Sequence, residues 1–145
     1  MQKTITLEQI IEKLNKKEEK KVKVTHVEVE EYGLIEFTRP NDNDILQYFS
    51  DVTKAIEFDD NEETKDKKVK TIDFRKMLDI SSEFVYKCCP MLQKKEIRDM
   101  FPKVSYYEIP IQVFGMNETI ELAGKLNDIF EGSNKLEKTQ EEIKN

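Results

Sequence analysis

The fold is decided by residues 84–132, FVYKCCPMLQKKEIRDMFPKVSYYEIPIQVFGMNETIELAGKLNDIFEG. The block begins inside a helical repeat, and Pro90 ends that repeat because proline restricts the backbone of the residue before it. Near its end, apolar side chains recur at helical spacing before the stop at Gly132; they are Ile120, Ala123, Leu126 and Phe130. The block therefore predicts several helices that are separated by proline and glycine and pack together.

The boundaries of these helices follow from the same pattern. A long helix is expected from about residue 72 to 88, and a shorter one from about 94 to 101. The segment that ends at Phe114 can begin anywhere from 105 to 109, because Pro110 has no backbone N–H to donate. Asn117 is the expected cap of a last helix that runs to about residue 131.

The N-terminal part begins with a capping-box pattern, Thr6 followed by Gln9, and predicts a helix over residues 7–16. The charged run that follows, residues 16–21, contains no apolar side chain and is expected to be a solvated connector. Alternating valines and a Tyr-Gly turn then predict a β-hairpin over residues 22–38. The valines change parity partway, which fits either a bulge near residues 25–26 or a strand whose ends face different neighbours.

After Pro40, apolar residues at steps of four and three predict a helix of about 15 residues, capped by the Asn-Asp pair that precedes it. The charge-rich residues 57–70 are expected to form a mobile loop, and residues 133–145 a flexible tail. The sequence thus predicts a single domain over residues 1–132. Its fold class is α+β and mainly helical, with an N-terminal helix and a β-hairpin (about 20–40) followed by a compact bundle of about four to five helices.

Composition excludes several classes of function. The 145 residues carry a formal net charge of −6, which opposes binding to nucleic acid, because that affinity depends on Lys and Arg neutralising phosphates. No apolar run is long enough to cross a membrane, and no basic N-terminal segment precedes a hydrophobic stretch, so we expect neither a membrane span nor a signal peptide. The two cysteines are adjacent and cannot join distant parts of the chain, so we expect a reducing compartment.

No grouping of residues predicts catalysis, a metal site or a cofactor. Cys88 and Cys89 are expected to pack as reduced thiols at a helix end, because zinc sites need ligands at wider spacings and further partners. His26 lacks a partner at any motif spacing, and the carboxylates at 42–44 and 59–63 do not follow a calcium-loop pattern. The aromatic residues of the C-terminal third fit either a core or a docking surface; they are Phe101, Tyr106, Tyr107, Phe114 and Phe130.

Several stretches resemble one protein family in order and spacing. They are Val85 to Leu92, Lys95 to Ile97, Glu118 to Leu126 with Gly132, and Phe37 to Asn41 running into Ile45-Leu46. Together they are similar to the XkdN-like phage tail assembly chaperones over about residues 20–132. The family commonly has a Pro-Gly-Glu-like turn before its last helix, whereas this chain has Phe114-Gly115-Met116-Asn117-Glu118.

This resemblance implies a non-enzymatic protein, encoded by a phage, a prophage or a tail-like bacteriocin, that acts in the cytoplasm of the bacterial host. It would bind the tape measure protein and the tail tube protein and keep them soluble until the tube polymerises. The alternative is a structural tail or connector protein that stays in the particle. For partner contact we expect Ile129, Phe130 and Leu136, where a structured helix gives way to a tail that could fold on binding.

Overall fold

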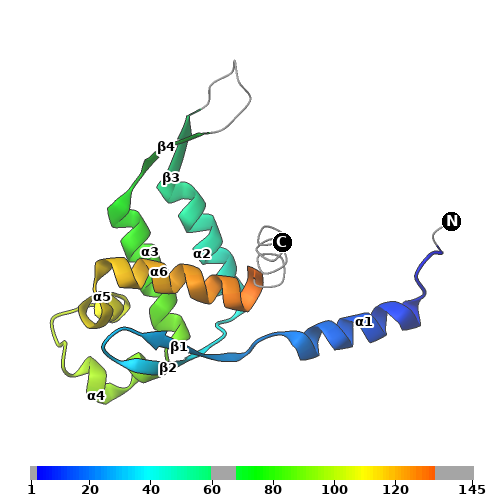
Figure 1. Cartoon of the computed structure of the whole chain (residues 1–145), viewed down its shortest axis with the longest axis horizontal. Helices are drawn as coiled ribbons and strands as arrows, with labels where there is room; N and C mark the ends of the chain where they lie inside the picture. The colour runs from blue at the N-terminus through cyan, green and yellow to red at the C-terminus, as the bar shows by residue number, and fades with distance from the viewer. Residues whose placement is uncertain (1–2, 60–67, 133–145) are drawn as a thin grey trace.

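A computed structural model describes residues 3–59 and 68–132 (Figure 1). It confirms the mainly helical α+β class, because a two-stranded hairpin is followed by the five α-helices α2 to α6. None of the helices in these ranges is both long and apolar enough to span a lipid bilayer.

Helix α1 (Leu7–Lys20) projects away from the rest of the molecule (Figure 1). The predicted capping box is present: the Gln9 backbone N–H donates to Thr6 Oγ1 at 3.2 Å, and the Thr6 N–H donates to Gln9 Oε1 at 3.0 Å. The helix runs past residue 16, so the prediction of a connector over residues 16–21 is wrong up to Lys20. Lys and Glu are good helix formers, and the i,i+3 ion pair between Lys21 and Glu18 (3.2 Å) lies at the added turn.

Strands β1 (Val24–Val29) and β2 (Gly33–Thr38) form the predicted antiparallel hairpin. Their register is continuous from Val24 opposite Thr38 to Val29 opposite Gly33, so there is no bulge near residue 25. Val24 instead faces solvent on the side of the strand away from the core, while four hairpin side chains enter the core: Val27, Val29, Ile35 and Phe37.

Helix α2 (Asp42–Ala55) begins as predicted, with the Asn41 side chain accepting the Asp44 N–H at 2.8 Å. It leads directly into a second antiparallel pair, β3 (Ile56–Asp59) and β4 (Lys68–Ile72). The prediction of a loop over residues 57–70 is therefore wrong at both of its ends, and residues 60–67 lie outside the described part of the chain. Ile56-Glu57-Phe58-Asp59 does alternate apolar and charged residues, but over only four positions that follow directly on the apolar repeat of α2, so the pattern is too short to mark a strand.

Helix α3 (Phe74–Cys88) is capped by Asp73, whose side chain accepts the Lys76 N–H at 3.1 Å. Pro90 follows its end, and a 3₁₀ turn (Met91–Gln93) leads to the short helix α4 (Lys95–Arg98), which is the ordered part of the helix predicted over 94–101. A second 3₁₀ turn (Tyr106–Glu108) precedes α5 (Ile109–Phe114). Pro110 lies in the first turn of α5, where its missing N–H costs no helical hydrogen bond.

Helix α6 (Met116–Asn127) is capped by Gly115 and not by the predicted Asn117. Gly115 has a φ of +88°, a conformation that side chains rarely adopt, and its carbonyl accepts the Thr119 N–H at 3.1 Å. The α-helix ends at Asn127, and a π-helical turn (Asp128–Gly132) continues it to the glycine that the sequence marks as the stop.

Helix α3 lies at the centre of the core, packed against α2, α5 and α6 (Figure 1). The inner face of the first hairpin joins the same continuous cluster of buried side chains. Within that cluster Phe37, Val85, Cys88, Ile109 and Leu126 are fully buried. Helix α1 contributes no buried residue. The block 84–132 therefore builds the interior, and the N-terminal helix stands outside it.

Candidate binding surface

The apolar face of α1 is exposed and has no partner among the described residues. Leu7 is 74% exposed, Ile10 42%, Ile11 49% and Leu14 57%. These side chains recur at steps of three, one and three, so they form one stripe along the helix. An amphipathic helix normally buries such a stripe, and a contiguous exposed apolar patch typically marks an interaction site.

A groove of about 600 Å³ continues this stripe toward the body of the molecule. One wall is the C-terminal half of α1 and the other is the outer face of α2. On the α2 wall Leu46 is 68% exposed and Phe49 is 57% exposed. The lining residues are Leu14, Lys17, Glu18, Lys21, Asp42, Ile45, Leu46, Phe49 and Glu131. The groove thus offers an apolar floor with charged residues of both signs at its rim.

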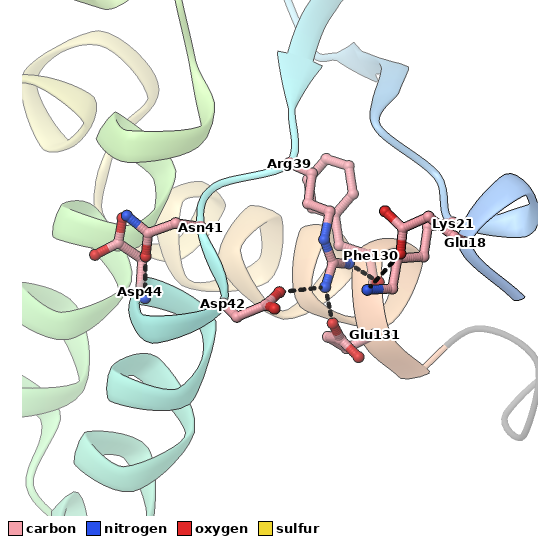
Figure 2. A network of polar contacts seen from close by, with 8 residues as sticks. All are labelled: Glu18, Lys21, Arg39, Asn41, Asp42, Asp44, Phe130 and Glu131. Carbon is pink, nitrogen blue, oxygen red and sulfur yellow. Dashed lines mark hydrogen bonds and ion pairs between the residues drawn. The ribbon is translucent and has the colours of Figure 1, made fainter. Parts of the chain in front are cut away.

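Arg39 holds two residues that line this groove, Asp42 and Glu131, and Figure 2 shows its contacts with them. Its side chain is only 9% exposed and donates to Asp42 Oδ1 at 3.0 Å, to Glu131 Oε1 and to the Phe130 carbonyl oxygen. The guanidinium has the planar, forked geometry that suits several acceptors at once. Through these contacts Arg39 joins the first turn of α2 to the π-helical turn that follows α6.

The charges around Arg39 are coupled. The pKa of the Asp42 carboxyl is lowered below its usual value, first by the hydrogen bond from Arg39 and then by the positive charge of Lys21. Lys21 Nζ also lies 3.2 Å from Glu18 Oε2, where α1 ends and the chain continues toward the hairpin. Asp44, in the same first turn of α2, pairs with Lys87 of α3 at 3.2 Å. The acidic residues near position 42 therefore form ion pairs within the fold.

The predicted contact residues do not lie together on this surface. Phe130 is 4% exposed and belongs to the core, and Ile129 packs against that core while partly buried. Leu136 lies outside the described residues. The structure brings this region to the groove only through the Phe130 carbonyl and the neighbouring Glu131.

Sequence reasoning missed Leu46 and Phe49, and the signal that could have identified them is weak. Ile45 and Phe49 belong to one helical repeat, yet Ile45 is buried and Phe49 is exposed. A repeat shows that a helix has an apolar side. It does not show how far the core extends around that side. The stripe on α1 was visible in the sequence, but its exposure in the described part of the chain was not.

The aromatic residues of the C-terminal third divide between the two roles left open by the sequence. Phe130 is in the core, whereas Phe101 and Phe114 are partly buried against it. Tyr106 and Tyr107 are 53% and 45% exposed; Tyr106 stacks on Tyr86, and Tyr107 meets the Tyr86 ring edge-on. A second, smaller apolar cavity of about 240 Å³ lies nearby; its lining includes Tyr32, Met91, Met100, Phe101 and Phe114.

The residues considered for chemistry lie in unreactive settings. Cys88 and Cys89 are free thiols in the core, and burial raises the pKa of both. A thiol in that state is a poor nucleophile. His26 lies on the exposed face of β1, with Nε2 3.7 Å from Glu36 Oε1. Residues 3–59 and 68–132 contain no cluster of three or more potential metal-ligating side chains. The arrangement can bind another chain by contact.

No family model, no curated protein and no solved structure matches this chain.

Proposed function

We propose that this protein is a phage tail assembly chaperone that binds the tape measure protein and tail tube subunits and keeps them soluble until the tube polymerises. The proposal takes its partners, and its setting in the bacterial cytoplasm, from the sequence resemblance to XkdN-like proteins. One structural observation supports it most. The stripe on α1 leaves Leu7, Ile10 and Leu14 exposed. Its last member, Leu14, lines a groove whose other wall exposes Leu46 and Phe49 on α2.

Such a surface suits a client made of long amphipathic helices. A helix-in-groove contact inserts apolar anchors at i, i+3, i+4 and i+7 into a hydrophobic groove. The groove between α1 and α2 has an apolar floor of this kind, and charges of both signs at its rim can pair with polar residues of a bound helix. The net charge of −6 limits association of the chaperone with other acidic proteins while the client is held.

The test is recovery of the two partners from a phage-induced lysate with the tagged protein. A Leu14→Asp, Phe49→Asp variant places a charge on each wall of the groove, where both side chains are exposed and the core is untouched. We expect the wild type to recover tape measure and tube proteins and the variant to recover neither. Ser50→Asp on the exposed surface of the same helix α2 is the matched control and should bind like the wild type.

Two results would overturn the proposal. One is a wild-type protein that recovers neither partner; full recovery of both partners by a folded double variant, with an unchanged circular dichroism spectrum and melting temperature, would instead exclude the groove as the binding site. The other is stoichiometric presence of the protein in purified particles by mass spectrometry, which would favour the alternative of a structural tail or connector component.

A further inference from the structure

The charged residues of α1 are sorted to either side of its apolar stripe. At about 3.6 residues per turn, the acidic side chains fall on one flank and most lysines on the other. Glu8, Glu12 and Glu19 lie on the acidic flank, and Lys13, Lys17 and Lys20 lie on the basic flank. Glu18 continues the line of the stripe on its acidic side, one turn beyond Leu14. All of these side chains are exposed. A helix with this distribution is complementary to a copy of itself that lies parallel to it.

The spacing agrees with a parallel pair in detail. If Leu7 and Leu14 take position a of a heptad and Ile10 position d, then Lys13 is at g and Glu18 at e of the next heptad. In a parallel pair, g of one helix meets the e that lies five residues further along the other, so Lys13 meets Glu18. In an antiparallel pair g meets g, and two lysines would face each other.

We infer that, in the absence of a client, a second copy of this chain covers the apolar stripe of α1 by parallel pairing of the two α1 helices. The shape permits it: α1 projects from the body and has no buried residue, so two such helices can lie side by side with both bodies at the same end (Figure 1). As a means of regulating the client-binding surface, the pairing rests on the proposed function. It shields the stripe until a client helix displaces the second copy.

The pairing is expected to be weak. The stripe is shorter than a usual coiled coil, and Lys17 takes the next d position, where the groove toward α2 begins. Its area falls short of the roughly 800 Å² per partner found in stable complexes. We therefore expect a dissociation constant on the order of 10 µM, so that a client helix can compete.

Disulfide trapping tests the geometry. In a parallel pair the two Leu7 positions meet across the seam, so Leu7→Cys should give a covalent dimer when a mild oxidant such as copper phenanthroline is added. Lys16→Cys, on the opposite face of the same helix, is the control and should stay monomeric. The native thiols Cys88 and Cys89 are buried and do not compete. Equal trapping at both positions, or none at Leu7→Cys, would overturn the inference.

Sedimentation of the purified protein without any client tests the charge pattern. Lys13→Glu or Glu18→Lys alone places like charges across the seam and should weaken dimerisation roughly tenfold for two pairs of modest strength. The double variant Lys13→Glu, Glu18→Lys restores opposite charges and should dimerise like the wild type. A wild type that is monomeric at about 100 µM, well above the expected dissociation constant, would refute the pairing.

The outcomes separate this inference from the proposed function. A monomer that still recovers tape measure protein would sink the pairing alone, and a dimer that recovers no client would sink the chaperone role alone. Single variants that dimerise like the wild type, or a double variant that stays monomeric, would contradict the parallel arrangement.

Discussion

Replacing Arg39 by alanine should destabilise the fold at the edge of the groove. The Arg39 side chain is 9% exposed and donates to the Phe130 carbonyl oxygen, to Glu131 and to Asp42 (Figure 2). Its removal leaves the Phe130 carbonyl, in the middle of the π-helical turn, without its charged donor. It also disconnects the start of α2 from the end of α6.

The expected loss of unfolding free energy follows from how exposed each hydrogen-bond partner of Arg39 is. A hydrogen bond from a charged donor to a partly buried carbonyl contributes about 1.5–2 kcal/mol. Glu131 is 42% exposed, so its ion pair contributes at most about 1 kcal/mol after solvent screening. Asp42 lies in water and adds little to this sum. The Arg39→Ala variant should therefore lose about 2–3 kcal/mol of unfolding free energy.

Urea unfolding followed by circular dichroism measures this loss. Arg75→Ala is the matched control, because Arg75 is 84% exposed and lies 3.8 Å from Asp79 in an i,i+4 pair on the surface of α3. Its expected cost is below about 0.5 kcal/mol. Arg39→Lys keeps the charge without the forked geometry and should fall between the two. If Arg39→Ala and Arg75→Ala unfold within about 0.5 kcal/mol of each other, the reasoning on Arg39 is refuted.

The pH dependence of stability in the acidic range gives an independent check on the contact between Arg39 and Asp42. Arg39 is the first cause of the lowered pKa of Asp42, so the Asp42 carboxyl in Arg39→Ala should titrate closer to its usual value of 3.8 by NMR. A carboxyl whose pKa is lowered in the folded state adds stability above its unfolded pKa, and that stability is lost as the pH falls through the folded pKa. The stability difference between wild type and variant should therefore narrow below about pH 4.

Three further predictions concern the core. Thr119→Val removes a buried hydroxyl that lies 2.6 Å from the Gly115 carbonyl oxygen and should cost about 1–3 kcal/mol, whereas Thr53→Val on exposed α2 should cost less than about 0.5 kcal/mol, both by urea unfolding. Cys88 and Cys89 should react with a thiol reagent such as DTNB at pH 8 only at the rate of unfolding, because burial raises both pKa values; fast native labelling would contradict this. Burial raises the pKa of Tyr48 to about 12, so wild type should lose stability between pH 10 and 12 relative to Tyr48→Phe, and parallel pH profiles would contradict this.

The sequence predicts those parts of the fold in which one short segment carries the whole signal. The cap at Asn41, the capping box at Thr6 and the end of α3 before Pro90 each depend on residues within one turn of the helix end. The hairpin is also local, because its two strands adjoin a tight turn in which Glu31 and Gly33 have positive φ. Such features follow from backbone geometry, which does not require knowledge of the neighbours.

One missed feature depends on a partner strand further along the chain, and the other on a backbone conformation that the residue types alone do not specify. Strands β3 and β4 pair across a charge-rich segment, and the alternation within Ile56–Asp59 is too short to mark the pairing. The cap of α6 lies at Gly115, two residues before Asn117, because a glycine at positive φ can turn the chain there while Thr119 bonds its carbonyl. The preference for asparagine at helix N-caps favours Asn117, but the backbone conformation places the cap at Gly115.

The candidate surface lies elsewhere than the sequence predicted, for a related reason. The apolar side chains of residues 84–132 are mostly enclosed by the core that they build, and Phe130, the centre of the predicted contact, is among them. A fully enclosed aromatic residue cannot be offered to a partner without unfolding its surroundings. The first 50 residues contain apolar side chains in excess of what that core can cover, on α1 and on the outer face of α2. Within the described residues, α1 leaves its apolar stripe outside the interior, and such an element is stabilised by whatever covers the stripe. The exposed surface of α1 and α2, which Arg39 links to the core, is therefore the place to test the proposed partner contact.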